Sequence, residues 1–279
     1  MRHSIFSKSL ILFVYIFFYV AESPETYATI FTLRDKNSTA KVNTENAAGM
    51  FSWEVDGTER LAHQWFWYRV GTGTGEHSID TLTLSSQGTF DTNFDNFDDT
   101  LFVRYTGTGF DLELKYVLNG SAADSGNSSI TENITITNRW CSALDFHFFQ
   151  YSDFNLSGSS DWGEMVNSNT IKQWDSSFVV SETVVTPEPD HWQIGEAGTI
   201  YDDGVGTGLL DDSLASTLSD AASPYNGDVT WAFQWDLTID AENSCQITKS
   251  KQIRITPEPA TVIMVGWGLL GIFISRKKI

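Results

Sequence analysis

The sequence contains few of the residues on which common catalytic and metal-binding motifs depend. It has 279 residues, of which two are cysteine and five are histidine. The histidines lack the i, i+4 spacing of metal-binding helices, and no Gly-x-Ser-x-Gly segment marks a hydrolase nucleophile. The glycines at 71, 73 and 75 lack a following helix and basic charge, so they predict a hairpin loop rather than a phosphate site. We therefore nominate no catalytic residue and expect a protein that is not an enzyme.

Basic residues are also scarce. The chain has 17 Lys and Arg against 36 Asp and Glu, which gives a formal net charge of −19 at pH 7. Such a surface repels nucleic acids and anionic lipid headgroups, and it favours solubility and the uptake of cations. The charge balance predicts no nucleic-acid partner.

Long apolar runs occur only near the two ends of the chain. At the N-terminus, Arg2, His3 and Lys8 precede an apolar stretch over residues 10–20 that is too short for a stable membrane anchor. This order is typical of a secretory signal peptide over residues 1–28, cleaved after Ala28. We expect the Sec export machinery to be a partner of the chain.

At the C-terminus, a Pro-Glu-Pro element precedes one apolar run and a basic cluster. As a helix, the run over residues 260–275 would be roughly 24 Å long, a little shorter than the hydrocarbon core of a bilayer. Basic residues are costly to move across a membrane, so we expect the cluster on the cytoplasmic side and the bulk of the chain outside. The six residues of this signal are Pro257, Glu258, Pro259, Arg276, Lys277 and Lys278.

This order of elements resembles the PEP-CTERM sorting signal of Gram-negative bacteria that make exopolysaccharide. The resemblance covers only Pro257 to Ile279, and it implies an exosortase-type membrane protease that recognises the Pro-Glu-Pro element. It also implies an inner-membrane intermediate, followed by a place at the cell surface or in the extracellular matrix. An ordinary C-terminal anchor is the alternative.

A second Pro-Glu-Pro at 187–189 is followed by polar residues and predicts a loop.

The body of the chain is dominated by period-two alternation. From Val229 to Ile239 apolar residues occupy alternate positions, and Phe110 to Tyr116 shows the same pattern. Many such short runs, separated by Asn-Gly and similar turns, predict an all-β, antiparallel β-sandwich over residues 29–254, with the sorting signal at 255–279. The body is also diffusely similar to β-sandwich domains found ahead of this kind of tail. Helical spacing occurs only at Leu210, Leu214 and Leu218, which predict one short helix.

Cys141 and Cys245 both lie beside turn-like sequence in the exported part of the chain. In an oxidising compartment they could form a disulfide between two neighbouring hairpin ends, which would close a loop of about 100 residues and stabilise the domain. Two unpaired thiols are the other interpretation. The spacing does not decide between them.

Oxygen ligands recur along the acidic segment 91–99. The side chains of Asp91, Asn93, Asp95 and Asp98 are the candidates to bind a hard cation such as Ca²⁺. The helix-loop-helix calcium motif is excluded, because Phe102 stands where its twelfth, acidic ligand is required. The alternative is a solvated acidic turn that Phe90, Phe94 and Phe97 anchor to the core.

Aromatic residues make up 14% of the chain and include 10 tryptophans. Their default role is to fill the core, although exposed rings could stack on sugars. The candidates for stacking are Trp53, Trp65, Trp67, Tyr68, Trp162, Trp174 and Trp192. The sequence thus predicts a non-catalytic surface or matrix protein associated with exopolysaccharide. The alternatives are a carbohydrate-binding module that holds matrix polysaccharide, and a carbohydrate-active enzyme on the same sandwich.

Overall fold

The computed structural model describes residues 29–73, 75–157, 161–201, 208–210, 214–220 and 224–256. The predicted signal peptide and the Pro-Glu-Pro element with its apolar run and basic cluster lie outside these ranges, and they stay predictions. None of the helical segments in the described ranges is long and apolar enough to cross a membrane.

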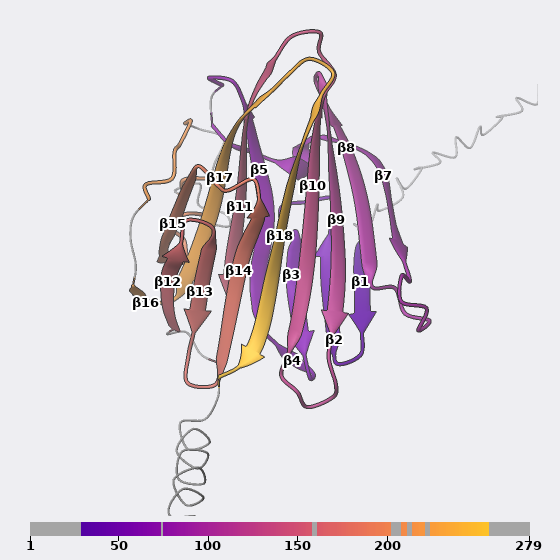
Figure 1. The fold of residues 1–279 in the computed structure, drawn as a ribbon, viewed down its shortest axis with the longest axis vertical. Helices are drawn as coiled ribbons and strands as arrows, with labels where there is room; N and C mark the ends of the chain where they lie inside the picture. Colours follow the sequence, from indigo (N-terminus) through magenta and orange to yellow (C-terminus); the bar gives the residue numbers. More distant parts are fainter. Residues whose placement is uncertain are drawn as a thin grey trace, which may run out of the picture.

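The described residues form two antiparallel sheets that pack face to face (Figure 1). In the first sheet the strand order is β1-β2-β3-β5-β11-β17-β15, with β4 beside β3 and β6 beside β5. Its strands are β1 (Ile30–Asp35), β2 (Ser38–Asn43), β3 (Met50–Val55), β4 (Thr58–Glu59), β5 (Leu61–Val70), β6 (His77–Ser78), β11 (Leu144–Phe154), β15 (His191–Glu196) and β17 (Val229–Ile239). A short 3₁₀ turn, η1 (Ile79–Thr81), follows β6.

The second sheet has the order β16-β12-β13-β14-β18-β10-β9-β8-β7. Its strands are β7 (Thr83–Phe90), β8 (Thr100–Gly107), β9 (Phe110–Gly120), β10 (Ser128–Asn138), β12 (Asp161–Asn167), β13 (Thr170–Trp174), β14 (Phe178–Thr186), β16 (Tyr225–Gly227) and β18 (Ser244–Ile255). The predicted antiparallel β-sandwich is confirmed.

Alternation along the strands places the core between the sheets. In β17, Trp231, Phe233 and Trp235 are buried, and the Trp231 ring stacks on Phe154 of β11 with ring centroids 5.4 Å apart. Isoleucines at alternate positions of β10 close the core from the other sheet. Burial of these apolar side chains on both inner faces is what holds the sheets together.

The helix predicted from Leu210, Leu214 and Leu218 is wrong for the residues that the structure describes there. Residues 208–210 and 214–220 contain no helix, and the Leu214 side chain is exposed. Leu210 and Leu218 are buried. Residues 214–220 cross the outer face of the first sheet as an irregular strap, in which the Ser216 carbonyl accepts a hydrogen bond from Arg69 of β5. The Leu218 amide donates to the Gln234 side chain of β17, which ties the strap to the sheet.

The interior also holds an ionic cluster that the sequence analysis did not predict. Lys249 and Lys251 of β18 lie fully buried between the sheets, beside Glu132 of β10 and Glu182 of β14. Lys251 Nζ lies 2.6 Å from Glu132 Oε1, and Lys249 Nζ lies 2.9 Å from Glu182 Oε1. Burial raises the pKa of Glu182, but the two ammonium groups outweigh burial and hold this pKa below its usual value. The two positive and two negative charges balance one another, which makes their burial tolerable.

Candidate functional site

The structure separates the site residues that the sequence suggested. Cys141 is exposed in the turn after β10 and Cys245 is half-buried on β18; both are free, which is the second of the two alternatives left open. The predicted calcium ligands lie in the loop between β7 and β8, where they bind their own backbone. The Asp91 carboxylate accepts from the amides of Phe94 and Asn96, at 2.7 and 2.8 Å.

The other proposed ligands are similarly engaged. Asp95 accepts from the Phe97 amide, Asp98 accepts from the Thr89 hydroxyl, and the Asn93 side chain donates to Asp35. The described residues contain no group of three or more His, Cys, Asp or Glu that could hold a metal ion. Calcium binding stays a prediction.

The prediction that Phe90, Phe94 and Phe97 anchor this loop to the core is wrong, because all three are exposed, Phe94 at 89%. The carboxylates that cap the loop's amides hold its shape without an apolar anchor.

Among the aromatic residues proposed for sugar stacking, Trp53, Trp65 and Trp67 are buried. Tyr68, Trp174 and Trp192 are half-buried, and Trp162 is exposed at 46%. Trp53 lies between the sheets, whereas Trp65 and Trp67 are alternate residues of β5 that are covered on the outer face of the first sheet, where the Trp67 ring centroid lies 4.7 Å from that of Tyr201.

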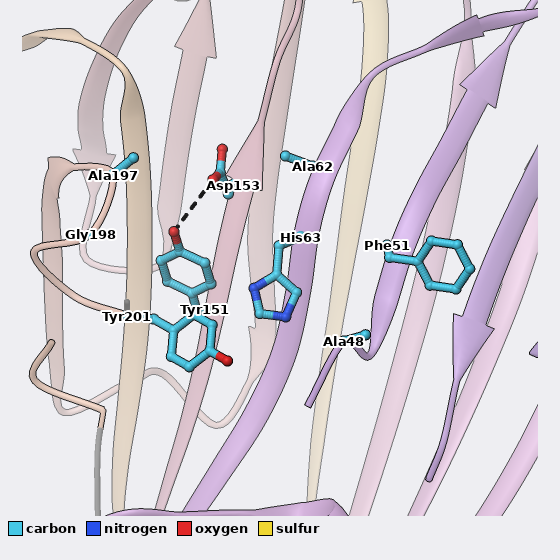
Figure 2. Close-up of a pocket in the computed structure, with 9 residues that line it drawn as sticks. All are labelled: Ala48, Phe51, Ala62, His63, Tyr151, Asp153, Ala197, Gly198 and Tyr201. Carbon is cyan, nitrogen blue, oxygen red and sulfur yellow. Dashed lines mark hydrogen bonds between the residues drawn. The ribbon is translucent and has the colours of Figure 1, made fainter. Parts of the chain in front are cut away.

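A pocket of about 310 Å³ opens on the outer face of the first sheet (Figure 2). It lies over β3, β5 and β11 and is closed on one side by the segment that follows β15. Its lining residues are Ala48, Phe51, Ala62, His63, Tyr151, Asp153, Ala197, Gly198 and Tyr201. The alanines and the glycine are too small to fill the pocket, and the histidine, the aspartate and the tyrosines provide its polar and aromatic groups.

Strand register brings the polar groups of the pocket together. His63 of β5 and Asp153 of β11 are direct partners across the antiparallel pair, so both side chains leave the sheet on the same face. Side chains so placed have Cβ atoms about 4.5–5.5 Å apart. The register shifts just beyond Asp153, where Phe154 pairs with Leu61 and Ala62 becomes the additional residue of a bulge. Such bulges commonly redirect side chains next to functional sites.

Aromatic rings form the walls of the pocket. The Tyr201 ring centroid lies 5.0 Å from that of His63 and 5.6 Å from that of Tyr151, and the rings of His63 and Tyr151 are 5.5 Å apart. Figure 2 shows these three rings gathered on one side, while the Phe51 ring points away from them. Burial raises the pKa of Tyr151, so its hydroxyl stays protonated. Three rings from three chain segments therefore frame one space.

Asp153 is the unusual carboxyl of the pocket. Burial raises its pKa to about 7, the negative charge of Asp228 adds to the shift, and a hydrogen bond from the Tyr151 hydroxyl opposes it. The Tyr151 oxygen is 3.5 Å from Asp153 Oδ2, which is a long contact. Asp153 Oδ1 is buried without a hydrogen-bond partner. At neutral pH this carboxyl both holds and releases a proton, which is what an acid–base group requires.

His63 is held in a defined tautomer. Its Nε2 lies 2.8 Å from the Ala47 carbonyl oxygen, which can only accept, so Nε2 carries the proton. In the neutral ring Nδ1 is then the basic nitrogen. An imidazole base and a carboxyl with a near-neutral pKa thus stand on adjacent strands beside one pocket.

The pKa of Asp153 has a consequence for stability. Because the folded value of about 7 lies above the ordinary 3.8, the folded state keeps a proton that the unfolded state releases, and stability falls as pH rises through this window. We expect Asp153→Asn to raise the free energy of unfolding by about 1–3 kcal/mol at pH 8, which is less than the full shift implies because the pocket admits water. At pH 4 the two proteins should differ little. Urea unfolding at both pH values measures this difference, and an equal change at the two values would contradict the raised pKa.

Comparison with known protein families finds no match to this chain, and comparison with curated proteins finds none. Solved structures do share its fold. The Slr1438 protein from Synechocystis sp. PCC 6803 matches with a TM-score of 0.54 and 8% identity, over 85% of this chain and 100% of that one. A galactose mutarotase-like protein from Lactobacillus casei matches with a TM-score of 0.48 and 10% identity, over 82% and 100%. An aldose epimerase homologue from C. elegans has a TM-score of 0.45 and 8% identity, over 82% and 99%.

These likenesses concern the fold, and they correct one expectation. The sequence led us to expect a protein that is not an enzyme; that expectation is contradicted, because the solved structures with a similar fold include a galactose mutarotase-like protein and an aldose epimerase homologue. The lack of a recognisable motif is therefore no sign of a non-catalytic protein in this fold. Which activity a domain has must be argued from its site.

Sequence reasoning missed Asp153 and His63. The alternation over 144–154 does place Asp153 on the register opposite to the inward-facing Phe146 and Phe148. The alternation does not reveal which strand pairs with this one, because β5 and β11 are separated by five other strands in the chain. A carboxylate at the end of an apolar strand was the available signal, and on its own it is a weak one.

Proposed function

We propose that this protein is an exported carbohydrate-active domain that binds one sugar ring in the pocket over β5 and β11. The observation that carries the proposal is the facing pair of Asp153 and His63, a carboxyl with a pKa of about 7 opposite an imidazole. Around this pair stand Tyr151 and Tyr201, whose rings suit the apolar C–H faces of a sugar.

The size of the pocket supports a single ring. Its volume of about 310 Å³ is at the lower end of the range for small-molecule sites. Polar groups line part of the wall and aromatic rings the rest, which matches a molecule with hydroxyl edges and apolar faces. An extended polymer would need an open groove instead.

The chemistry that this pair supports most directly is the interconversion of the two anomers of a free aldose. His63 Nδ1 takes the proton of the anomeric hydroxyl while the Asp153 carboxyl gives its proton to the ring oxygen. The bond from the anomeric carbon to the ring oxygen breaks as the carbonyl forms. Rotation and closure, with both protons returned, give the other anomer. No atom is gained or lost, and no cofactor takes part in these proton transfers.

The test is the rate at which the purified mature chain equilibrates α-galactose and α-glucose, followed by polarimetry or NMR. We expect acceleration over buffer with an optimum near neutral pH, because one group must be protonated and the other free. Saturable binding of an aldose without acceleration of its anomer exchange would show that the pocket binds sugar but does not catalyse the reaction. Absence of both binding and acceleration across a panel of aldoses would refute the site.

The C-terminal sequence supports the proposed location. We propose that export exposes the domain and that an exosortase-type protease then reads Pro257, Glu258 and Pro259, so that the domain reaches the cell surface or matrix. The acidic composition and the Pro-Glu-Pro, apolar and basic order support this route. Intact mass of the native protein is expected to lack residues 1–28 and the apolar tail. A mass that retains Arg276 to Ile279 would make the chain an ordinary anchored protein.

A further inference from the structure

The outer face of the second sheet differs from the rest of this acidic molecule. Outward-facing positions of β10 carry Ser129, Thr131, Asn133, Thr135 and Thr137. Those of β18 carry Gln246, Thr248, Ser250, Gln252 and Arg254. The two strands are neighbours, and β14 on their flank adds Ser181 and Thr183 (Figure 1). The acidic residues of these three strands, Glu132 and Glu182, both point inward, so this part of the face has no carboxylate.

Two tryptophans stand at one end of this face. Trp162 of β12 and Trp174 of β13 are direct partners in register, with ring centroids 6.5 Å apart and planes 20° from parallel. Trp162 is 46% exposed. The Lys172 ammonium lies 4.2 Å from the Trp174 ring centroid and 3.7 Å from a Glu164 oxygen, so it packs against the face of one of the two rings. Tryptophan rings that reach the surface are enriched at binding sites.

A shallow groove of about 220 Å³ lies at the other end of the same face. Its lining includes Asn119, Ser129, Gln252 and Arg254. Register connects this groove to the tryptophans: Ser181 of β14 is the partner of both Lys172 and Gln252. Gln252 in turn pairs with Ser129, and Ser129 with Asn119. One row of polar side chains thus crosses the sheet from β13 to β9.

We propose that this row and the two tryptophans bind a strand of uncharged polysaccharide, at a site separate from the pocket on the first sheet. From Trp162 on β12 to Asn119 on β9, the tryptophans and the row together cross five strand spacings, about 24 Å, enough for several sugar units. Hydroxyl and amide side chains donate and accept hydrogen bonds, as sugar hydroxyls do, and the indole rings offer stacking surface. An uncharged polymer fits because the central strands carry neither carboxylates nor a basic cluster.

Affinity electrophoresis of the mature chain tests this proposal, with a soluble β-glucan and a galactan as neutral polymers and alginate as the charged comparison. We expect a neutral polymer to retard the protein, and Trp162→Ala and Trp174→Ala to weaken binding at least about tenfold. Trp140→Ala is the matched control, because this exposed tryptophan lies in the turn after β10, outside the row. It should bind as the parent does.

Three results would overturn the inference: no retardation by either neutral polymer, retardation by alginate alone, or full binding by Trp162→Ala. Self-association that Trp162→Ala abolishes, seen by sedimentation, would instead assign the face to a second copy of the chain. The pocket is tested separately, since Asp153→Asn should leave polymer binding unchanged and Trp162→Ala should leave anomer exchange unchanged.

Discussion

Replacing Lys249 by methionine is expected to lower the free energy of unfolding by about 3–5 kcal/mol. Methionine preserves most of the volume of the lysine stem but removes the charge that faces Glu132 and Glu182. One ammonium group, that of Lys251, then remains for two fully buried carboxylates. An uncompensated charge in the interior costs far more than a lost surface pair, because no water can replace the partner.

Urea unfolding of the variant at pH 8 and at pH 5 measures this loss. The deficit should shrink at the lower pH, because a buried carboxyl without its counter-ion has a raised folded pKa and is penalised only while it is ionised. Lys41→Met is the matched control: Lys41 Nζ is 3.3 Å from Glu54, but both side chains are partly exposed to solvent, so we expect a change below about 1 kcal/mol. Adding Glu132→Gln to Lys249→Met should recover part of the loss. If Lys249→Met loses as little stability as Lys41→Met, charge compensation within the buried cluster does not stabilise the fold.

Local alternation predicts the strands well in this chain. The runs Val229–Ile239 and Phe110–Tyr116 lie within β17 and β9, with the apolar positions buried as expected for most of their length. This works because the side-chain period of a strand is a property of the strand alone. The class of fold follows from many such runs, without knowledge of which strands pair.

The order of strands in the sheets, and the sites formed across neighbouring strands, depend on contacts between residues far apart in the sequence. β11 lies between β5 and β17, which brings His63 opposite Asp153, although no spacing in the sequence relates them. The ionic cluster has the same origin, since its four side chains come from β10, β14 and β18. Pairing information of this kind is absent from a single sequence.

Two errors in the sequence analysis have a common cause. The spacing of Leu210, Leu214 and Leu218 was interpreted as a short helix, and the apolar character of Phe90, Phe94 and Phe97 as an anchor of the acidic turn to the core. In the structure, a strap alternates buried and exposed leucines, and a loop capped by its own carboxylates leaves its phenylalanines in water. In an irregular segment, the burial of each side chain depends on the surface that the segment contacts, so sequence periodicity does not predict which residues are buried.

Replacing Asp153 by asparagine is expected to slow anomer exchange by about 10²–10⁴-fold while leaving the fold intact or more stable. Asparagine has nearly the same shape and fits beside Tyr151, but it cannot give up and regain a proton. The near-neutral pKa of Asp153 should therefore disappear from the pH–rate profile. NMR exchange between anomers measures the rate across pH 5–9.

Asp145→Asn is the control on the same strand, because Asp145 is exposed on β11 outside the residues that line the pocket. It should retain the parental rate and the parental pH–rate profile.

His63→Asn should also lose activity, and the double variant should lose little more than either single one if the two groups act in one step. An Asp153→Asn protein that keeps both the rate and its dependence on pH would remove Asp153 from the chemistry. The gain in stability expected for the same variant at pH 8 separates this outcome from unfolding, because a better-folded protein with a lost rate has lost its proton donor.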